Sequence, residues 1–596
     1  MDNSGLDSQF TKEAAPPFMD GSTLNEEELI SAMEEVDFKQ EPQESNLKNE
    51  ELPPSYQDST QMRSDFPNFR SYRYSMFEKD EPILLDHLQP PGFMPSLTEA
   101  TAHLRLLKAF GVLKKKVLKN FPQSKTESNS NWLWRVFVTV AVRRFIVFIS
   151  ALRHHASKFP TTERKLETTT DARSQRFTAM ANQLVPPLDV IMMWHAFMLN
   201  PLTYYDVFTR KDMYYFVNYP FPLHILDLYI DGETFEFKVP DESKKKYSAF
   251  LGEFTTVAMD LRYDSDLSRF YEQKVTFYSP FTNKPLTDPV PLTTNKAFGF
   301  CNRTFSAKTK GHQYQSLCRQ DGHWNTITFD ELRKVILDFD TRTPRLLEGT
   351  LKYYSAVLAR PRFSSRNPEL ISHQISRSVV NSSLRAHMSA TNDTFVQSLQ
   401  EMLVGVASGN LNRRKAENLL LRPYLRFNTV SLTVRKGVNI GEDLVDCVTR
   451  QGRFVDKMNN LDWVGSPMTK EILHEALTRY QRFFTLLTDE LVTQMVVPTL
   501  DIDLMWHTHQ LMLYGYFRDC KYSPRQAVVD HNDKVEKIPL DNGFEYTSQL
   551  YKERYQDEYC ICFCDDCVRH RKSKMSPLTK LFKSLKKLEP IQTLAR

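Results

Sequence analysis

Apolar residues recur at the three- and four-residue spacing of amphipathic helices over two long stretches of the chain. The first stretch contains ATAHLRLLKAFGVLKKKVL (100–118) and WLWRVFVTVAVRRFIVFISAL (132–152), and the second contains MTKEILHEALTRYQRFFTLLTDELVTQM (468–495). Between them, short β-like runs such as LHILDLYI (223–230) and TFEFKV (234–239) are separated by Asp-Gly and Pro-rich turns. The pattern predicts a mostly α fold with a β-containing insert. We place helical halves over residues 76–220 and 346–567 and the insert over 221–345.

One pattern occurs twice, as VPPLDVIMMWHAFML beginning at Val185 and as VPTLDIDLMWHTHQL beginning at Val497. Each copy follows a helix-rich stretch, so the sequence predicts two helical halves that each end in a Pro-x-Leu-Asp…Trp-His helix. Pro186 and Pro498 are expected to open these helices, because a proline loses no intrahelical bond there, and Asp189 or Asp501 sits in the first turn, where the positive end of a helix favours a carboxylate.

The polar residues of the two copies are interpreted as a structural row that packs helices together through large rings and hydrogen bonds. They are Asp189, Trp194, His195, Asp501, Asp503, Trp506 and His507. Asp503 and His507 are four apart and share one helix face, whereas His507 and His509 are two apart and point to nearly opposite sides. Metal binding by one of these histidines and general acid–base catalysis remain the alternatives.

The chain of 596 residues has eight cysteines, which are too few for a disulfide scaffold, and four of them lie within the stretch 560–567. Four thiolates so close together would be crowded around one tetrahedral zinc ion, so the site is expected to take a ligand from elsewhere. The predicted zinc ligands are Cys562, Cys564, Cys567 and His509, with His531 as another source. The alternative is reduced thiols without metal. A weaker zinc pattern is formed by Cys301, His312, Cys318 and His323. The pair His531 and Asp533 formally matches an iron-binding motif, but that motif belongs on strands, whereas the chain here is expected to be a loop beside helices.

The two ends of the chain are polar and oppositely charged. Residues 1–60 hold 15 acidic residues against three lysines, whereas residues 568–596 hold nine Lys or Arg against one Glu. Residues 1–75 have the composition of a disordered segment. Within it, Pro53, Pro54 and Tyr56 form a PPxY motif, whose prolines preset the conformation that WW domains bind. A WW-domain protein, such as a ubiquitin ligase, is the predicted partner.

Residues 568–596 are predicted to be a basic amphipathic tail that could lie on an anionic membrane surface. No apolar segment follows the N-terminus, so we expect no secretory signal and a cytoplasmic, also nuclear, location. The apolar run 132–152 is interrupted by Arg135 and the Arg143–Arg144 pair, which favours a buried helix over a membrane span. With only 18 glycines and no phosphate-cradling loop, no specific nucleic acid is predicted.

Five stretches together resemble the glycine-rich domain-containing protein-like family, in the fungal form without a glycine-rich tail. They are PPLDVIMMWHAFMLNPLTYYDV, RQGRFVDKMNNLDW, PTLDIDLMWHTHQLMLYGY, DHNDKVEKIPLDNGFEYTSQLYKERY and CFCDDC. The resemblance implies a protein of unestablished function. Fungal relatives carry a zinc-ribbon-like insert with CPxC pairs, where this chain has Ser279-Pro280-Phe281-Thr282, and some relatives bear a sulfonate dioxygenase label.

The residues favour a non-enzymatic cytosolic scaffold or adaptor that recruits a WW-domain protein through PPSY. A metal-dependent enzyme using zinc or iron is the first alternative, with His507 or His509, His531 and the cysteines as its site. A peripheral membrane protein anchored by the basic tail is the second alternative.

Overall fold

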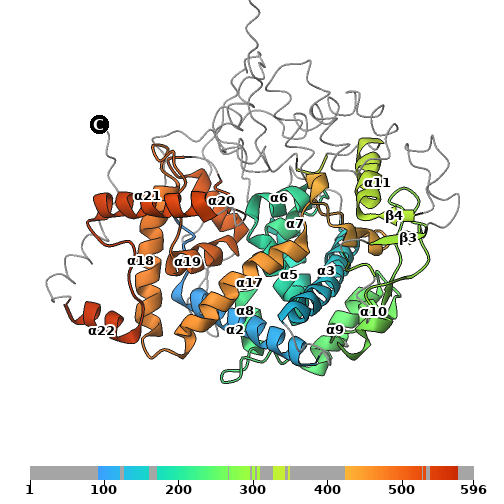
Figure 1. The fold of residues 1–596 in the computed structure, drawn as a ribbon, viewed down its shortest axis with the longest axis horizontal. Coiled ribbons are helices and arrows are strands. Elements are labelled where there is room, and N and C mark those ends of the chain that lie inside the picture. Colours follow the sequence, from blue (N-terminus) through green and yellow to red (C-terminus); the bar gives the residue numbers. More distant parts are fainter. Residues whose placement is uncertain are drawn as a thin grey trace, which may run out of the picture.

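The protein is mostly helical with a few short strands, as a computed structural model shows (Figure 1). The structure describes residues 91–120, 127–159, 171–265, 267–294, 299–302, 305–308, 326–342, 347–349, 423–525, 528–531, 534 and 537–574.

The first helical stretch is organised around one long buried helix. Its elements are α2 (Leu97–Asn120), α3 (Glu127–Ala156), α4 (Asp171–Ala181), α5 (Leu188–Met198), α6 (Pro201–Thr209) and α7 (Tyr214–Val217). Every residue of α3 from Val136 to Leu152 is buried, so this apolar run forms a core helix, as its sequence predicts. No described helix is long and apolar enough to cross a membrane.

The middle region contains more helix than the sequence predicts. Its helices are α8 (Leu223–Leu226), η4 (Asp227–Tyr229), α9 (Asp241–Gly252), α10 (Ala258–Leu261), η5 (Leu267–Glu272) and α11 (Phe329–Arg342). The run LHILDLYI, predicted as β-like, is helical over α8 and η4. That prediction is wrong because a mostly apolar stretch of eight residues is too short to show whether its period is that of a helix or a strand, and packing against α2 decides it.

The described strands form two antiparallel ladders. Strand β1 (Lys274–Val275) pairs with β2 (Val290–Pro291), with Val275 opposite Val290. Strand β3 (Ser306–Lys308) pairs with β4 (Thr326–Thr328), with Ala307 opposite Ile327. The β content of the insert is therefore real but small.

The second helical stretch packs directly on the first. Its elements are η8 (Thr429–Thr433), α17 (Leu444–Leu461), η9 (Trp463–Gly465), α18 (Thr469–Leu487), α19 (Leu500–Gln510), α20 (Leu513–Lys521), α21 (Lys537–Tyr555) and α22 (Asp565–Lys574). Helix α17 contacts α2, α3 and α5, and Figure 1 shows it running across them. The described helices of both stretches therefore share one continuous apolar core.

A buried charge cluster fixes the segment 347–349 against α6. Arg210 pairs with Asp206 at 2.9 Å and with Glu348, and the Gly349 amide donates to Asp206 at 2.9 Å. Tyr424 donates to Asp340 and accepts from the Glu348 amide. Burial raises the pKa of Asp206, whereas its neighbour Arg210 lowers it. The cluster ties three segments that are far apart in the sequence.

Candidate functional site

The two copies of the repeated motif form helices α5 and α19, which begin at Leu188 and Leu500. Each helix starts two residues after the first proline of its copy, because a proline at that position keeps the chain extended before the first turn. Both helices are buried over almost their whole length. The polar side chains of the motif therefore need partners inside the protein.

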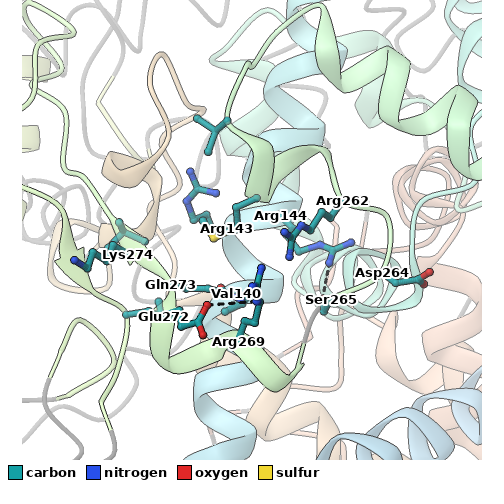
Figure 2. A pocket seen from close by; sticks show the side chains of 14 residues that line it. Val140, Arg143, Arg144, Arg262, Asp264, Ser265, Arg269, Glu272, Gln273 and Lys274 are labelled. Carbon is teal, nitrogen blue, oxygen red and sulfur yellow. Dashed lines mark hydrogen bonds and ion pairs between the residues drawn. The ribbon is translucent and has the colours of Figure 1, made fainter.

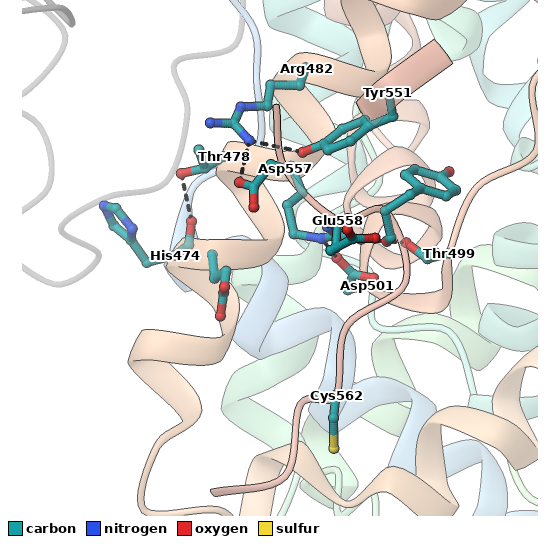
Figure 3. Close-up of polar contacts among 12 residues, drawn as sticks. His474, Thr478, Arg482, Thr499, Asp501, Tyr551, Asp557, Glu558 and Cys562 are labelled. Carbon is teal, nitrogen blue, oxygen red and sulfur yellow. Dashed lines mark hydrogen bonds and ion pairs between the residues drawn. The ribbon is translucent and has the colours of Figure 1, made fainter. Parts of the chain in front are cut away.

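The aspartate of each first turn pairs with a buried arginine. The Asp189 carboxylate lies 3.2 Å from Arg144 Nε, and the Asp501 carboxylate lies 2.6 Å from Arg479 Nε (Figure 3). All four side chains are at least nine-tenths buried. Besides their predicted position at the positive end of a helix, these carboxylates therefore each form an ion pair that the sequence does not reveal.

The same arginines and two tyrosines lock the chain that leads into each motif helix. Arg144 donates to the Tyr263 carbonyl, and Arg479 donates to the Tyr559 carbonyl at 2.6 Å. The hydroxyl of Tyr263 donates to the Val185 carbonyl at 3.0 Å. In the second copy, the Tyr559 hydroxyl donates to the Val497 carbonyl at 2.6 Å. The two copies therefore repeat a set of tertiary contacts as well as a sequence.

Each motif tryptophan donates to a tyrosine ten residues later. Trp194 Nε1 donates to the Tyr204 hydroxyl at 3.0 Å, and Trp506 Nε1 donates to the Tyr516 hydroxyl at 3.1 Å. These bonds hold α5 on α6 and α19 on α20, because each tyrosine belongs to the following helix. The tryptophans satisfy their one polar atom while burying the ring.

The motif histidines each face a second histidine. His195 Nε2 lies 2.8 Å from His103 Nε2, and His103 Nδ1 lies 2.8 Å from the Thr508 hydroxyl. His507 Nε2 lies 3.2 Å from His531 Nε2. Burial lowers the pKa of His195 to about 3 and lowers the pKa of His103 and His507 well below the ordinary value. These three imidazoles are neutral at physiological pH.

Only the second copy adds a carboxylate to its histidine pair. Asp503 Oδ1 lies 3.3 Å from His507 Nε2 and 3.6 Å from His531 Nε2, so three potential metal ligands converge. The first copy has Ile191 at the position of Asp503. The side chains are 18% (Asp503), 1% (His507) and 10% (His531) exposed, so the three ligand atoms lie just beneath the surface.

The polar row is therefore a series of separate pairs and one three-residue group. Asp189 and Asp501 bind arginines, the tryptophans bind tyrosines, and His195 binds His103. The helical spacing of Asp503 and His507 correctly places them side by side. His531 comes from a loop 24 residues later, and no periodicity in the sequence points to it.

The predicted metal ligand His509 lies apart from the cysteines. Its Nδ1 is 2.9 Å from the Tyr480 hydroxyl, and its Nε2 is 3.2 Å from Asp519. The same Asp519 accepts from the amides of Gly92 and Phe93. His509 is fully buried and serves as a packing and hydrogen-bonding residue, which removes it from the predicted cysteine site.

Three cysteines do come together where the loop after α21 meets the first turn of α22. The sulfur atoms of Cys562, Cys564 and Cys567 all lie within 4.8 Å of one another. Hydrogen bonds, first from the Cys567 amide, lower the pKa of Cys564, and hydrogen bonds to Cys564 and Cys562 raise the pKa of Cys567 to about 11. Cys562 and Cys564 are exposed, and Figure 3 shows Cys562 on the segment below Asp501.

Several predicted features lie outside the described residues. They are the PPxY residues Pro53, Pro54 and Tyr56, the tail beyond residue 574, and His312, Cys318, His323 and Asp533. Cys301 is described and buried, and burial raises its pKa to about 12, so it holds a neutral thiol. Residues 279–282 lie in a turn closed by the Ser279 amide, which donates to the Lys284 carbonyl at 2.9 Å.

Part of the chain is similar to known proteins. The model of the glycine-rich domain-containing protein-like family matches residues 411–519. Glycine-rich domain-containing protein 1 of Arabidopsis thaliana is 32% identical over 125 residues, which is 20% of this chain and 14% of that protein. Glycine-rich domain-containing protein 2 of the same plant is 31% identical over 125 residues, 20% of this chain and 15% of that protein. The chain thus covers about one seventh of these relatives. No solved structure matches.

Proposed function

We propose, on the premise that residues 411–519 belong to the glycine-rich domain-containing protein-like family, that this protein binds a divalent transition-metal ion through Asp503, His507 and His531. The observation that carries the proposal is the ligand spacing. The three ligand atoms lie 3.2, 3.3 and 3.6 Å apart. Ligands that each stand about 2.0–2.2 Å from one tetrahedral ion have separations of this size.

The chemistry of the three groups suits zinc or iron better than calcium or magnesium. Two imidazoles and one carboxylate form a ligand set typical of zinc and iron sites, whereas calcium and magnesium prefer oxygen alone. Burial lowers the pKa of His507, so its ring is neutral and keeps a lone pair for the metal at physiological pH. The Asp503 carboxylate supplies one negative charge against a divalent ion.

An ion at this place would strengthen the link between two parts of the chain. Asp503 and His507 belong to α19, and His531 belongs to the loop after α20. The ring of His531 already packs on Trp506 with centroids 4.9 Å apart. The metal would therefore stabilise the second motif helix in its position, which is a structural role compatible with a scaffold.

Metal content and thermal stability test the proposal. At this site the full chain is expected to bind one zinc ion, and zinc at about 100 times its dissociation constant should add about 2.7 kcal/mol of stability. His507→Gln and His531→Gln should lose both effects. His195→Gln is the matched control, because it alters the histidine of the first copy, whose partner is His103 without a carboxylate. Equal metal content in all four proteins would overturn the assignment.

A second metal site is proposed at Cys562, Cys564 and Cys567, with the fourth ligand supplied by a water molecule or another protein. Their sulfur atoms lie within 4.8 Å of one another, and thiolates are strong zinc ligands. Cys562→Ser should remove one ion without affecting the ion held by His507. If the chain carries one ion and Cys562→Ser alone removes it, the histidine site is wrong.

The wider role proposed for the chain is that of a non-enzymatic scaffold that recruits a WW-domain protein through Pro53, Pro54 and Tyr56. The non-enzymatic part of this role is supported by the polar groups of the motif, most of which form hydrogen-bonded or ion pairs within the core. Tyr56→Ala should abolish capture by an immobilised WW domain, and Tyr74→Ala, a tyrosine outside the motif, should leave it unchanged. Capture that survives Tyr56→Ala would contradict this role.

A metal-dependent enzyme is the second candidate, because three protein ligands leave a coordination position open for water or substrate. The limited exposure of Asp503 and His531 favours the structural role. The two roles differ in their response to cobalt substitution. A structural ion keeps one absorption spectrum, whereas an open position changes its spectrum when azide or cyanide is added.

A further inference from the structure

A cavity of about 270 Å³ with a basic lining opens beside the buried helix α3 (Figure 2). Its walls come from α3, from the segment around α10 and from the chain between η5 and β2. The cationic lining residues are Arg143, Arg144, Arg262, Arg269 and Lys274. Two carboxylates, Asp264 and Glu272, also line it, so the lining holds five cations against two anions, a net charge of three.

Two arginines form the buried floor of this cavity. Only 8% of each side chain of Arg143 and Arg144 is exposed. Arg143 pairs with Asp260, and Arg144 pairs with Asp189, so each has one carboxylate behind it. Arg143 Nε has no hydrogen-bond partner within the described part of the chain. A buried guanidinium N–H without an acceptor is costly, and an anion in the cavity would remove that cost.

Both acidic lining residues lie at the exposed rim, where each is close to a cation. Asp264 is 76% exposed and pairs with Lys244 at 3.0 Å. Glu272 is 70% exposed and lies 3.4 Å from Arg269. Counting Asp189 and Asp260 behind the wall as well, five cations still face four carboxylates. The cavity therefore keeps a positive charge after these four carboxylates are counted.

In the second motif copy, aromatic rings surround the arginine that corresponds to Arg144. Arg479, the counterpart of Arg144, has the rings of Tyr551 and Tyr559 at 5.7 Å and that of Phe563 at 5.9 Å. It also donates to Thr499 and to the carbonyls of Glu558 and Tyr559 (Figure 3). In the first copy the cavity lies over the corresponding arginine. The first-copy arginine therefore lies under a cavity, whereas aromatic rings lie over the second-copy arginine.

We propose that this cavity binds the phosphate monoester group of a small molecule. Charged N–H groups bind phosphate oxygens strongly, and the Arg143 Nε–H on the floor and the rim cations supply such donors from several directions. The volume lies just below that of pockets for drug-sized ligands, which suits a sugar-sized body. Val140, Val275 and Leu292 provide an apolar wall for that body.

Titration calorimetry of the full chain tests the proposal with glucose 6-phosphate as the probe and glucose as its uncharged control. Binding of the phosphate ester, with no heat from glucose, is expected. Arg269→Gln combined with Lys274→Gln removes two exposed rim cations, and it should weaken binding about tenfold or more. Lys245→Gln combined with Lys246→Gln is the matched control, since it removes the same charge from the exposed face of α9 and should leave affinity unchanged.

Vesicles distinguish the source of the phosphate. Phosphatidylcholine vesicles with and without phosphatidylinositol 4-phosphate present the same monoester on a lipid headgroup. Binding to those vesicles, weakened by the rim variant and not by its control, would support the cavity with a lipid as the source. Two results would overturn the proposal: no binding of either phosphate ester, or equal weakening by the rim variant and its control.

Discussion

At the scale of single residues, the buried histidines make the stability of the folded protein depend on pH. His195, His103 and His507 are all buried, and burial lowers the pKa of each. In the unfolded chain these imidazoles titrate near the ordinary value of about 6.5. Below that pH the unfolded chain binds more protons than the folded protein, so stability is expected to fall as pH falls.

His195 offers the clearest test, because its pKa in the folded protein is about 3. Between pH 6.5 and 5.5 the native His195 should cost about 1.0 kcal/mol of stability. His195→Gln should therefore show a smaller loss than the unaltered protein, measured by urea unfolding at both pH values. His474→Gln changes an exposed histidine and should leave the pH dependence as it is. An unchanged slope in His195→Gln would mean that the ring is charged in the folded protein.

The buried ion pair of the second copy is the second residue-scale prediction. Arg479 and Asp501 are 5% and 4% exposed, so Asp501→Asn would leave an uncompensated buried guanidinium. The expected loss is about 3–5 kcal/mol of unfolding free energy. Glu242→Gln breaks the exposed pair with Lys246 and is expected to change little. Similar urea midpoints for the two variants would argue against the structural role of the motif aspartate.

Two glycines show how helices α17 and α20 differ in their surroundings. A Cβ atom at Gly515 in α20 would lie 2.6 Å from Phe93 Cβ, whereas a Cβ atom at Gly452 in α17 would meet nothing within 4 Å. Gly515→Ala should therefore cost about 1–3 kcal/mol through overpacking. Gly452→Ala should add about 0.5–1 kcal/mol, because alanine favours a helix interior more than glycine does. Thermal unfolding of both variants would check these opposite signs.

At the scale of the elements, helical periodicity was a sound guide where it was long. The runs 100–118 and 132–152 form α2 and α3, and 468–495 contains α18. The prediction for the short run 223–230 was wrong, because a mostly apolar stretch of eight residues fits either a strand or a helix until a neighbour covers it. The bounds of α5 and α19 follow from the prolines just before them.

For the molecule as a whole, α2 connects the two motif copies. It contacts α3 and α5 from the first stretch and α17, α18 and α19 from the second. His103 on α2 contacts both His195 on α5 and Thr508 on α19. A substitution that destabilises the second copy is therefore expected to destabilise the first copy as well.

This connection predicts that the two copies unfold together. Calorimetry should show one cooperative transition for both, and Asp501→Asn should move that whole transition to lower temperature. His103→Leu, which removes the link on α2, should lower the same transition without splitting it, since the apolar contacts of α2 remain. A transition that keeps its original temperature in Asp501→Asn would show that the copies unfold independently.

The sequence by itself determined the helical class, the two motif helices and the nearness of Asp503 to His507, because these depend on residues within one or two helical turns. It also placed three cysteines close together, since they are adjacent in the chain. Only the tertiary structure decided which groups meet over long distances. It brought His531 to His507, paired the motif aspartates with Arg144 and Arg479, and turned His509 toward Tyr480 instead of the cysteines. These outcomes depend on how helices pack, and no local pattern encodes the partner that packing supplies.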